Sequence, residues 1–263
     1  MNRPAVLVFA GSDPGGGAGL QADLQAVAAF GVHPLTVVTA LTVQDNDRVF
    51  AVQPVAADFV RRQAQALIDK VGIAAVKIGI VGNRANAEAI ADCIAMLRQR
   101  QPALPVVLDP VLASGHGDVL TADDAVAAVM PLLPLATIVT PNLPEAARLC
   151  GGEQNVERQA QALLQHCPNV LIKGGHGTGA EVLNSWHGRH AQRTWSWPRL
   201  PGSFHGTGCT LASAIAALLA RGETMAAALD TAQAYCHQAL LSAYAIADGQ
   251  RIPNRSVSIE DVE

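Results

Sequence analysis

The feature that most constrains the fold is the alternation of short, uniformly apolar runs with longer amphipathic segments. Short apolar runs without polar alternation are typical of strands buried on both faces, which occur in parallel sheets. The expected strands are Ala5–Ala10, Leu35–Thr42, Ala75–Val81, Val106–Val111, Thr137–Thr140 and Val170–Lys173. The expected helices are Gly19–Phe30, Ala57–Lys70, Ala85–Arg100, Ala122–Leu133 and Val156–His166. The pattern predicts an α/β protein with a mostly parallel central sheet and helices on both faces.

After Lys173 the pattern changes. Two alternating runs around His187-Gly188-Arg189 predict a small antiparallel hairpin at one edge of the sheet. The runs are Val182–Trp186 and Arg193–Trp197, and two helices follow at Cys209–Arg221 and Glu223–Ala247. The polar tail beyond Asp248-Gly249 is expected to fray. The chain shows neither a repeat nor a low-complexity linker, so residues 1–263 are expected to form a single domain.

Composition excludes several classes of protein. The net charge of -4 is spread without basic runs, which argues against a nucleic-acid partner. No stretch approaches the roughly 18 consecutive apolar residues of a membrane span. The first apolar run stops at Gly11-Ser12-Asp13, too early for a signal peptide, so we expect a strand there and a cytoplasmic protein. Five cysteines without C-x-x-C spacing argue against a disulfide framework and a zinc site.

A turn of small residues, Gly206-Thr207-Gly208, precedes an apolar helix that begins near Cys209. The first turn of a helix has unpaired N–H groups and the positive end of the helix dipole, so it attracts anions. A thiol at this position is expected to have a pKa lowered toward neutrality, which would let Cys209 act as a base. The alternative is a tight connection followed by an ordinary buried cysteine.

Polar residues and glycines follow the expected strands, where ligands bind in doubly wound sheets. These residues are Gly11–Gly19, Gln44, Gly79, Gly82, Asp109, Thr140–Glu145 and Lys173–His176. The glycine loop fits neither common phosphate motif. A dinucleotide fingerprint begun at Gly15 would need glycine in place of Leu20, and a P-loop would need Lys and Ser or Thr after its last glycine. We therefore expect this loop to form the wall of a small-substrate site.

Seven ordered motifs resemble those of the hydroxymethylpyrimidine/phosphomethylpyrimidine kinases of thiamine biosynthesis. They are Gly11–Asp23, Thr39–Gln44, Lys77–Gly79, Asp109–Val111, Thr140–Ala146, Ile172–His176 and His205–Thr210. The resemblance covers most of the chain. It implies a ribokinase-like, three-layer sandwich and a cytoplasmic homodimer that uses Mg²⁺ and ATP. The reaction it implies is phosphorylation of 4-amino-5-hydroxymethyl-2-methylpyrimidine, with the monophosphate open as a second acceptor.

The resemblance also implies roles at the phosphoryl-transfer site. Gly206, Thr207 and Gly208 would hold the migrating phosphoryl group beside Cys209 as the catalytic thiol. ATP would contact Lys173 and Asn142 together with Thr207 and Gly208. Asp109 and Glu145 carry the carboxylates that Mg²⁺ prefers, although a turn aspartate and a helix-start glutamate would look the same. Lys173 suits ATP phosphates, with a buried salt bridge as the alternative.

Substrate contacts are expected from Gly11, Asp23, Gln44, Gly79 and Val111. The Gln44 amide offers a donor and an acceptor, which match the ring nitrogen and amino group of an aminopyrimidine. Asp23 is the least specific member, because a solvated helix carboxylate would show the same pattern. Two further polar residues, His176 and His205, are interpreted as loop residues outside the catalytic set.

Three alternatives remain. A pyridoxal kinase is the nearest, because such relatives carry either Asp or Cys at the position of Cys209. A non-catalytic nucleotide sensor would not need this thiol, and a nicotinamide-dependent oxidoreductase is disfavoured by the failed fingerprint.

The loop Val111–Asp118 lacks a lysine that is common in the family, and His116 is mostly neutral at pH 7. We therefore expect poor phosphorylation of the monophosphate, improving toward pH 6.

Overall fold

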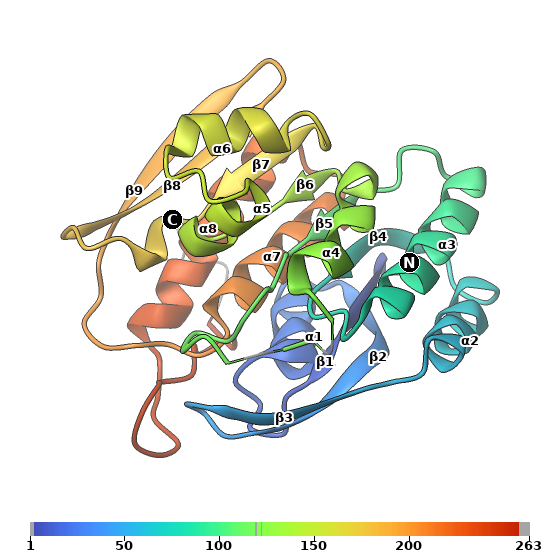
Figure 1. Cartoon of the computed structure of the whole chain (residues 1–263), viewed down its shortest axis with the longest axis horizontal. Coiled ribbons are helices and arrows are strands. Elements are labelled where there is room, and N and C mark those ends of the chain that lie inside the picture. Colours follow the sequence, from blue (N-terminus) through green and yellow to red (C-terminus); the bar gives the residue numbers. More distant parts are fainter. Residues whose placement is uncertain (1–2, 119, 122, 258–263) are drawn as a thin grey trace.

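The computed structural model describes residues 3–118, 120–121 and 123–257. Its sheet has the strand order β3-β2-β1-β4-β5-β6-β7-β8-β9. The strands are β1 (Ala5–Ser12), β2 (His33–Gln44), β3 (Val49–Pro54), β4 (Ile73–Ile78), β5 (Val106–Leu108), β6 (Ile138–Val139), β7 (Asn169–Ile172), β8 (Glu181–Gly188) and β9 (Gln192–Pro198). The six central strands, β2, β1, β4, β5, β6 and β7, run parallel to one another. The strand β3 at one edge and the hairpin β8–β9 at the other edge are antiparallel to their neighbours (Figure 1). The predicted parallel sheet and edge hairpin are confirmed.

Helices cover both faces of the sheet. They are α1 (Gly19–Ala29), α2 (Ala57–Ile68), α3 (Arg84–Arg100), α4 (Ala125–Val129), α5 (Leu143–Leu149), α6 (Val156–Leu163), α7 (Thr207–Ala220) and α8 (Met225–Leu241), with 3-10 turns η1 (Met130–Leu135) and η2 (Gly174–His176). Alternate residues of β1 enter separate cores: Leu7 and Phe9 pack with α2, α3 and α6, and Val6 and Val8 pack with α1, α7 and α8. The expected three-layer arrangement is therefore confirmed.

One strand and one helix were not expected from the sequence. The strand β3 pairs with an extended β2, so Gln44 ends an antiparallel ribbon and does not follow a parallel strand. The residues of β3 are exposed or half-buried, which explains why the sequence shows no buried-strand pattern there. The unexpected helix is α5, which has only one turn after its proline.

Several expected boundaries are wrong. The strands β4 and β5 end three residues early, because the chain leaves the sheet at Gly79 and at Pro110. The helix expected from Ala122 to Leu133 is the short α4 followed by the proline-containing η1, and Ala122 itself lies outside the described residues. At the other end, α7 begins at Thr207 and not at Cys209, and α8 ends at Leu241.

The tail does not fray as expected before residue 258. Ile252 and Arg255 are buried, and isolated bridges join Tyr244 to Ile252 and Phe204 to Arg251. The tail thus returns to the loop that precedes α7. Among the residues that the structure describes, no helix is both long and apolar enough to cross a membrane.

Candidate active site

A cavity of about 560 Å³ lies at the carboxyl ends of the central strands. Loops after β1, β5, β6 and β7 contribute to its wall, as do the end of β2 and the first turn of α7. Most of the residues predicted for the site meet here. They are Gly11, Gln44, Asp109, Val111, Asn142, Glu145, Lys173, Gly206, Thr207, Gly208 and Cys209. Asp23 and Gly79 are not among the lining residues.

The segment Gly206–Cys209, here called the anion turn, forms the start of α7. Gly206 is the N-cap and has a left-handed backbone with φ 81°. A Cβ at this position would collide with the carbonyl of Gly17, so the position requires glycine. The next amides, those of Thr207 to Cys209, belong to the first turn and have no intrahelical acceptor. The anion site expected at this turn therefore has the right backbone geometry.

The sequence predicted a lowered pKa for the Cys209 thiol, and this prediction is wrong. Burial raises the pKa of Cys209 to about 11, and the carboxylates of Asp23 and Asp109 oppose ionisation while Lys77 favours it. The helix N-terminus does not overcome these effects. A thiol with this pKa is protonated at neutral pH.

Lys173 and Asp109 form an ion pair against the anion turn. Lys173 Nζ donates to Asp109 Oδ1 at 2.7 Å. A Cβ on Gly208 would come within 3.1 Å of Lys173 Nζ and 3.4 Å of Asp109 Oδ2, so the pair lies directly beside the turn. Burial alone would lower the pKa of Lys173, but Asp109 and Glu145 raise it above its usual range. The salt-bridge alternative is thus observed, and the lysine still faces the cavity.

Asn142 and Glu145 form a capping box at the start of α5. The Glu145 amide donates to Asn142 Oδ1, and the Asn142 amide donates to Glu145 Oε2, each at 2.8 Å. The structural alternative for Glu145 is therefore observed, although the residue also lines the cavity. Burial raises the pKa of Glu145 to about 7, with Lys173 lowering it and Asp109 raising it.

The residues present fit a magnesium ion that is held mainly by phosphates. No cluster of three or more metal-ligating side chains occurs in the described parts of the chain. Asp109 and Glu145 supply two carboxylates to one cavity, and Asp109 Oδ2 accepts no hydrogen bond from the described residues. Mg²⁺ commonly takes one or two carboxylates and completes its shell with phosphate and water.

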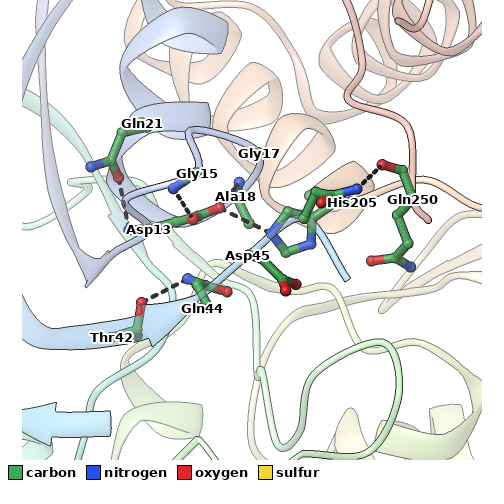
Figure 2. Close-up of polar contacts among 12 residues, drawn as sticks. Asp13, Gly15, Gly17, Ala18, Gln21, Thr42, Gln44, Asp45, His205 and Gln250 are labelled. Atoms are coloured by element: carbon green, nitrogen blue, oxygen red, sulfur yellow. Dashed lines mark hydrogen bonds and ion pairs between the residues drawn. The ribbon is translucent and has the colours of Figure 1, made fainter. Parts of the chain in front are cut away.

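Gln44 reaches the cavity from the end of β2. Its Nε2 donates to Thr42 Oγ1 at 2.8 Å, which fixes the carboxamide (Figure 2). Because the amide has two N–H groups and a carbonyl oxygen, it keeps one donor and one acceptor for a ligand. The recognition role of Gln44 stays a prediction.

The substrate contacts predicted for Asp23 and Gly79 need correction. Asp23 is fully buried and accepts two hydrogen bonds from Lys77 Nζ at 2.8 Å and one from Ser213 at 2.7 Å. A Cβ on Gly79 would come within 2.8 Å of Lys77 Nζ. The glycine therefore makes room for the lysine, and the aspartate neutralises it. The sequence could not show this, because an interior and a solvated carboxylate on a helix share one pattern.

Asp13 and His205 join the glycine loop to the anion turn, a link that sequence reasoning missed. Asp13 accepts from the amides of Gly15 at 2.8 Å and Ala18 at 2.7 Å (Figure 2). His205 Nε2 lies 2.9 Å from Asp13 Oδ2, one residue before the turn. Burial would raise the pKa of Asp13, but the His205 contact and the backbone donors lower it below its usual range. His205 is thus a structural residue of the site.

Arg48 and His116 also line the cavity, and the sequence analysis did not connect them. Arg48, in the connection between β2 and β3, pairs with Asp118 through Nη2 at 2.6 Å and Nε at 3.1 Å. His116 contacts the Asp47 carbonyl through Nδ1 at 2.8 Å. Both Arg48 and His116 line the cavity. The loop that lacks the family lysine therefore faces an arginine, and that arginine is already paired with a carboxylate.

Comparison with known proteins places these observations in a family. A family model described as phosphomethylpyrimidine kinase matches residues 13–254. A hydroxymethylpyrimidine/phosphomethylpyrimidine kinase of Rhizobium meliloti (strain 1021) is 42% identical over 257 residues, which are 93% of this chain and 93% of that protein.

Two solved structures share the fold. The pyridoxal kinase of Staphylococcus aureus in complex with AMP-PCP and pyridoxal superposes with a TM-score of 0.86 at 26% identity, covering 97% of this chain and 94% of the other. The phosphomethylpyrimidine kinase of Clostridium difficile 630 gives a TM-score of 0.76 at 32% identity, with coverage of 91% and 100%.

Proposed function

Because the chain belongs to the phosphomethylpyrimidine kinase family, we propose that its cavity brings ATP and a pyrimidine alcohol together at the anion turn. The protein is an ATP-dependent kinase of thiamine biosynthesis that phosphorylates the hydroxymethyl group of 4-amino-5-hydroxymethyl-2-methylpyrimidine. One observation carries the assignment of roles. The anion turn, the Lys173–Asp109 pair and Gln44 line one cavity, and the pair fills the space that a Cβ on Gly208 would occupy.

ATP phosphates are held by Lys173 and by the amides of Thr207 and Gly208 in this proposal. Phosphoryl transfer depends mainly on positioning and on charge stabilisation of the migrating group. Mg²⁺, when bound at Asp109 and Glu145, supplies further neutralisation of the phosphates. Lys173 would hold phosphate oxygens from its place beside Asp109, and Asp109 Oδ2, which accepts no hydrogen bond from the described residues, would serve the metal.

The acceptor hydroxyl needs a group to take its proton. Cys209 is our candidate, since it lies at the third position of α7 and lines the same cavity. Only the thiolate can accept a proton, so the raised pKa of this thiol means that the active fraction grows with pH. Gln44 orients the pyrimidine by its amino edge, and Gly11 and Val111 form the walls around the ring.

A pyridoxal kinase activity is the second candidate. The observation in its favour is the closer superposition on the Staphylococcus aureus pyridoxal kinase than on the Clostridium difficile structure. Overall superposition reports the fold, whereas substrate choice depends on the pocket. The identity to curated pyrimidine kinases over nearly the full chain favours the pyrimidine alcohol.

The test is a coupled assay of ADP formation with purified protein and ATP. We expect turnover that requires both Mg²⁺ and the pyrimidine alcohol. ADP formation that does not depend on the alcohol would reject the proposed acceptor, and binding of ATP without turnover would favour a nucleotide sensor.

We also infer that the protein works as a cytoplasmic homodimer of single-domain subunits. Several large apolar side chains remain exposed on the β2–β3 ribbon, where a second copy would cover them. They are Leu41, Val43 and Phe50, each more than half exposed. Exposed apolar groups of this kind are a common mark of an association surface.

A further inference from the structure

Arg255 places a buried positive charge behind the anion turn. The residue is 2% exposed and lies just beyond residue 254, where the family match ends. Its guanidinium donates to Thr210 Oγ1, Gln25 Oε1 and the Gly17 carbonyl, all of which are neutral. None of its partners among the described residues is a carboxylate, and burial of a charge costs folding free energy.

Two of these hydrogen bonds connect Arg255 to the site. Arg255 Nε donates to Thr210 Oγ1 at 2.8 Å, and that hydroxyl donates to the Gly206 carbonyl at 2.8 Å. Arg255 Nη2 donates to the Gly17 carbonyl. A Cβ on Gly206 would come within 2.8 Å of Arg255 Nη2, so the guanidinium lies against the N-cap of α7. The guanidinium thus bonds the glycine loop directly and reaches the anion turn through the Thr210 hydroxyl.

We propose that Arg255 is a positioning residue for phosphoryl transfer, which clamps the glycine loop to the anion turn and adds positive potential behind its amides. This inference rests on the proposed kinase function. Donors that are fixed before the reaction stabilise developing negative charge better than donors that must reorganise. The charge acts in a site of low exposure, where its field is weakly screened. The buried pair of Lys77 and Asp23 is neutral as a unit.

The competing explanation is that Arg255 only anchors the tail. The chain offers a matched control for it. Tyr235 OH donates to the Arg255 carbonyl at 2.8 Å, so Tyr235→Phe weakens the anchor and leaves the guanidinium in place. Tyr235 does not line the cavity and lies on α8. Arg255→Met removes the charge and keeps much of the volume, and Arg255→Gln and Arg255→Lys are milder variants that protect against a folding failure.

The experiment measures kcat with ATP and the pyrimidine alcohol, the Kd of ADP by calorimetry, and amide hydrogen exchange in residues 13–19 and 206–210. For Arg255→Met we expect kcat to fall by roughly 10-fold or more. Exchange should become faster in both segments, and the Kd of ADP should stay near its wild-type value because ADP lacks the migrating group. Arg255→Gln should fall in between, and Tyr235→Phe should behave like the wild type in all three measurements.

Wild-type kcat and wild-type exchange in Arg255→Met would overturn the proposal. An equal loss of kcat in Tyr235→Phe would also overturn it, because the tail anchor would then explain the effect. If the wild-type protein shows no kinase turnover, the proposed function fails. Hydrogen exchange still decides whether the clamp exists, since faster exchange confined to the two segments in Arg255→Met supports it and unchanged exchange refutes it.

Discussion

At the residue scale, Cys209 shows two opposing influences on one thiol. It occupies the third position of α7, where the helix dipole favours a thiolate. Burial raises its pKa to about 11, with Asp23 and Asp109 adding to the shift against Lys77. The sequence contains the helix start but not the burial or the two carboxylates. This is why the position of the thiol could be predicted and its acidity could not.

The first prediction concerns this thiol as the base. Cys209→Ala should lower kcat by roughly 10²–10⁴-fold, with little change in the affinity for ATP. Because the thiolate fraction increases as pH rises toward about 11, wild-type kcat should increase between pH 7 and 9. Steady-state kinetics across this range measure both effects. Near-wild-type turnover in the alanine variant would remove Cys209 from the mechanism and leave the anion turn alone responsible.

The second prediction concerns Gln44. Gln44→Leu keeps the volume and leaves the polar edge of the pyrimidine unpaired, at about 1–3 kcal/mol per group. The KM for the pyrimidine alcohol should rise while the KM for ATP stays constant. Gln53→Leu, on the exposed neighbouring strand β3, is a matched control and should change neither value. Constant values in the Gln44 variant would place the residue outside the recognition site.

At the scale of elements, one interior ion pair joins β4 to two helices. Lys77 on β4 bonds Asp23 on α1, which also accepts from Ser213 on α7. All three side chains are buried. The pair holds α7, and with it the anion turn, at a fixed position over the sheet. Strands and helices of this kind follow from hydrophobic periodicity, but a tie between three elements depends on the tertiary fold.

Removal of one partner should therefore be costly. Lys77→Met leaves the Asp23 carboxylate buried without its cation, and we expect a loss of about 3–5 kcal/mol in the free energy of unfolding. The double variant Lys77→Met with Asp23→Leu should lose less than Lys77→Met alone, because it strands no charge. Urea denaturation of both proteins gives the comparison. A single variant as stable as the wild type would show that the pair does not hold these elements together.

A second junction links the β2–β3 ribbon to the loop after β5. Arg48 is paired with Asp118, so its charge at the cavity mouth is neutralised. The hydrogen bonds from Arg48 and from the Val49 amide hold the pKa of Asp118 well below its usual range. Because the paired arginine offers no net positive charge, we still expect the monophosphate, a dianion, to be a poor acceptor.

Asp118→Asn tests that junction because it frees the positive charge of Arg48. We expect the variant to increase kcat/KM for the monophosphate relative to kcat/KM for the alcohol by roughly several-fold. The reason is that the freed guanidinium can make one additional Coulombic contact with the substrate phosphate near the surface. Arg48→Met should change the ratio in the opposite direction. Unchanged ratios in both variants would mean that other groups, such as the amides of Gly15–Gly19, receive the substrate phosphate.

At the scale of the whole molecule, the layers, the rim of the sheet and the β8–β9 hairpin at one edge followed from the sequence, whereas the β3 strand at the other edge did not. Buried parallel strands such as β1 carry a uniform apolar signal, whereas β3 is an exposed edge strand with no such signal. The anion turn was predictable from its small residues. Arg255 was not, because it reaches the site from the far end of the chain through tertiary contacts alone.

The proposed homodimer is a prediction at this scale too. Light scattering after size-exclusion chromatography should give twice the mass of the 27.3 kDa chain. Phe50→Glu, at the exposed edge strand, should shift the mass toward the monomer if the β2–β3 ribbon is the contact surface. A monomer mass for the wild type would reject the dimer, and a dimer unaffected by this change would move the contact elsewhere.

If the proposed function is right, the protein phosphorylates a pyrimidine alcohol in preference to pyridoxal, and a competition assay measures this preference. Equal concentrations of 4-amino-5-hydroxymethyl-2-methylpyrimidine and pyridoxal are incubated with ATP, Mg²⁺ and the wild-type protein, and the two phosphate esters are resolved by ³¹P NMR. We expect the pyrimidine ester to form first and in excess, with one ADP released per ester. Formation of pyridoxal phosphate in excess, or ADP without either ester, would contradict it.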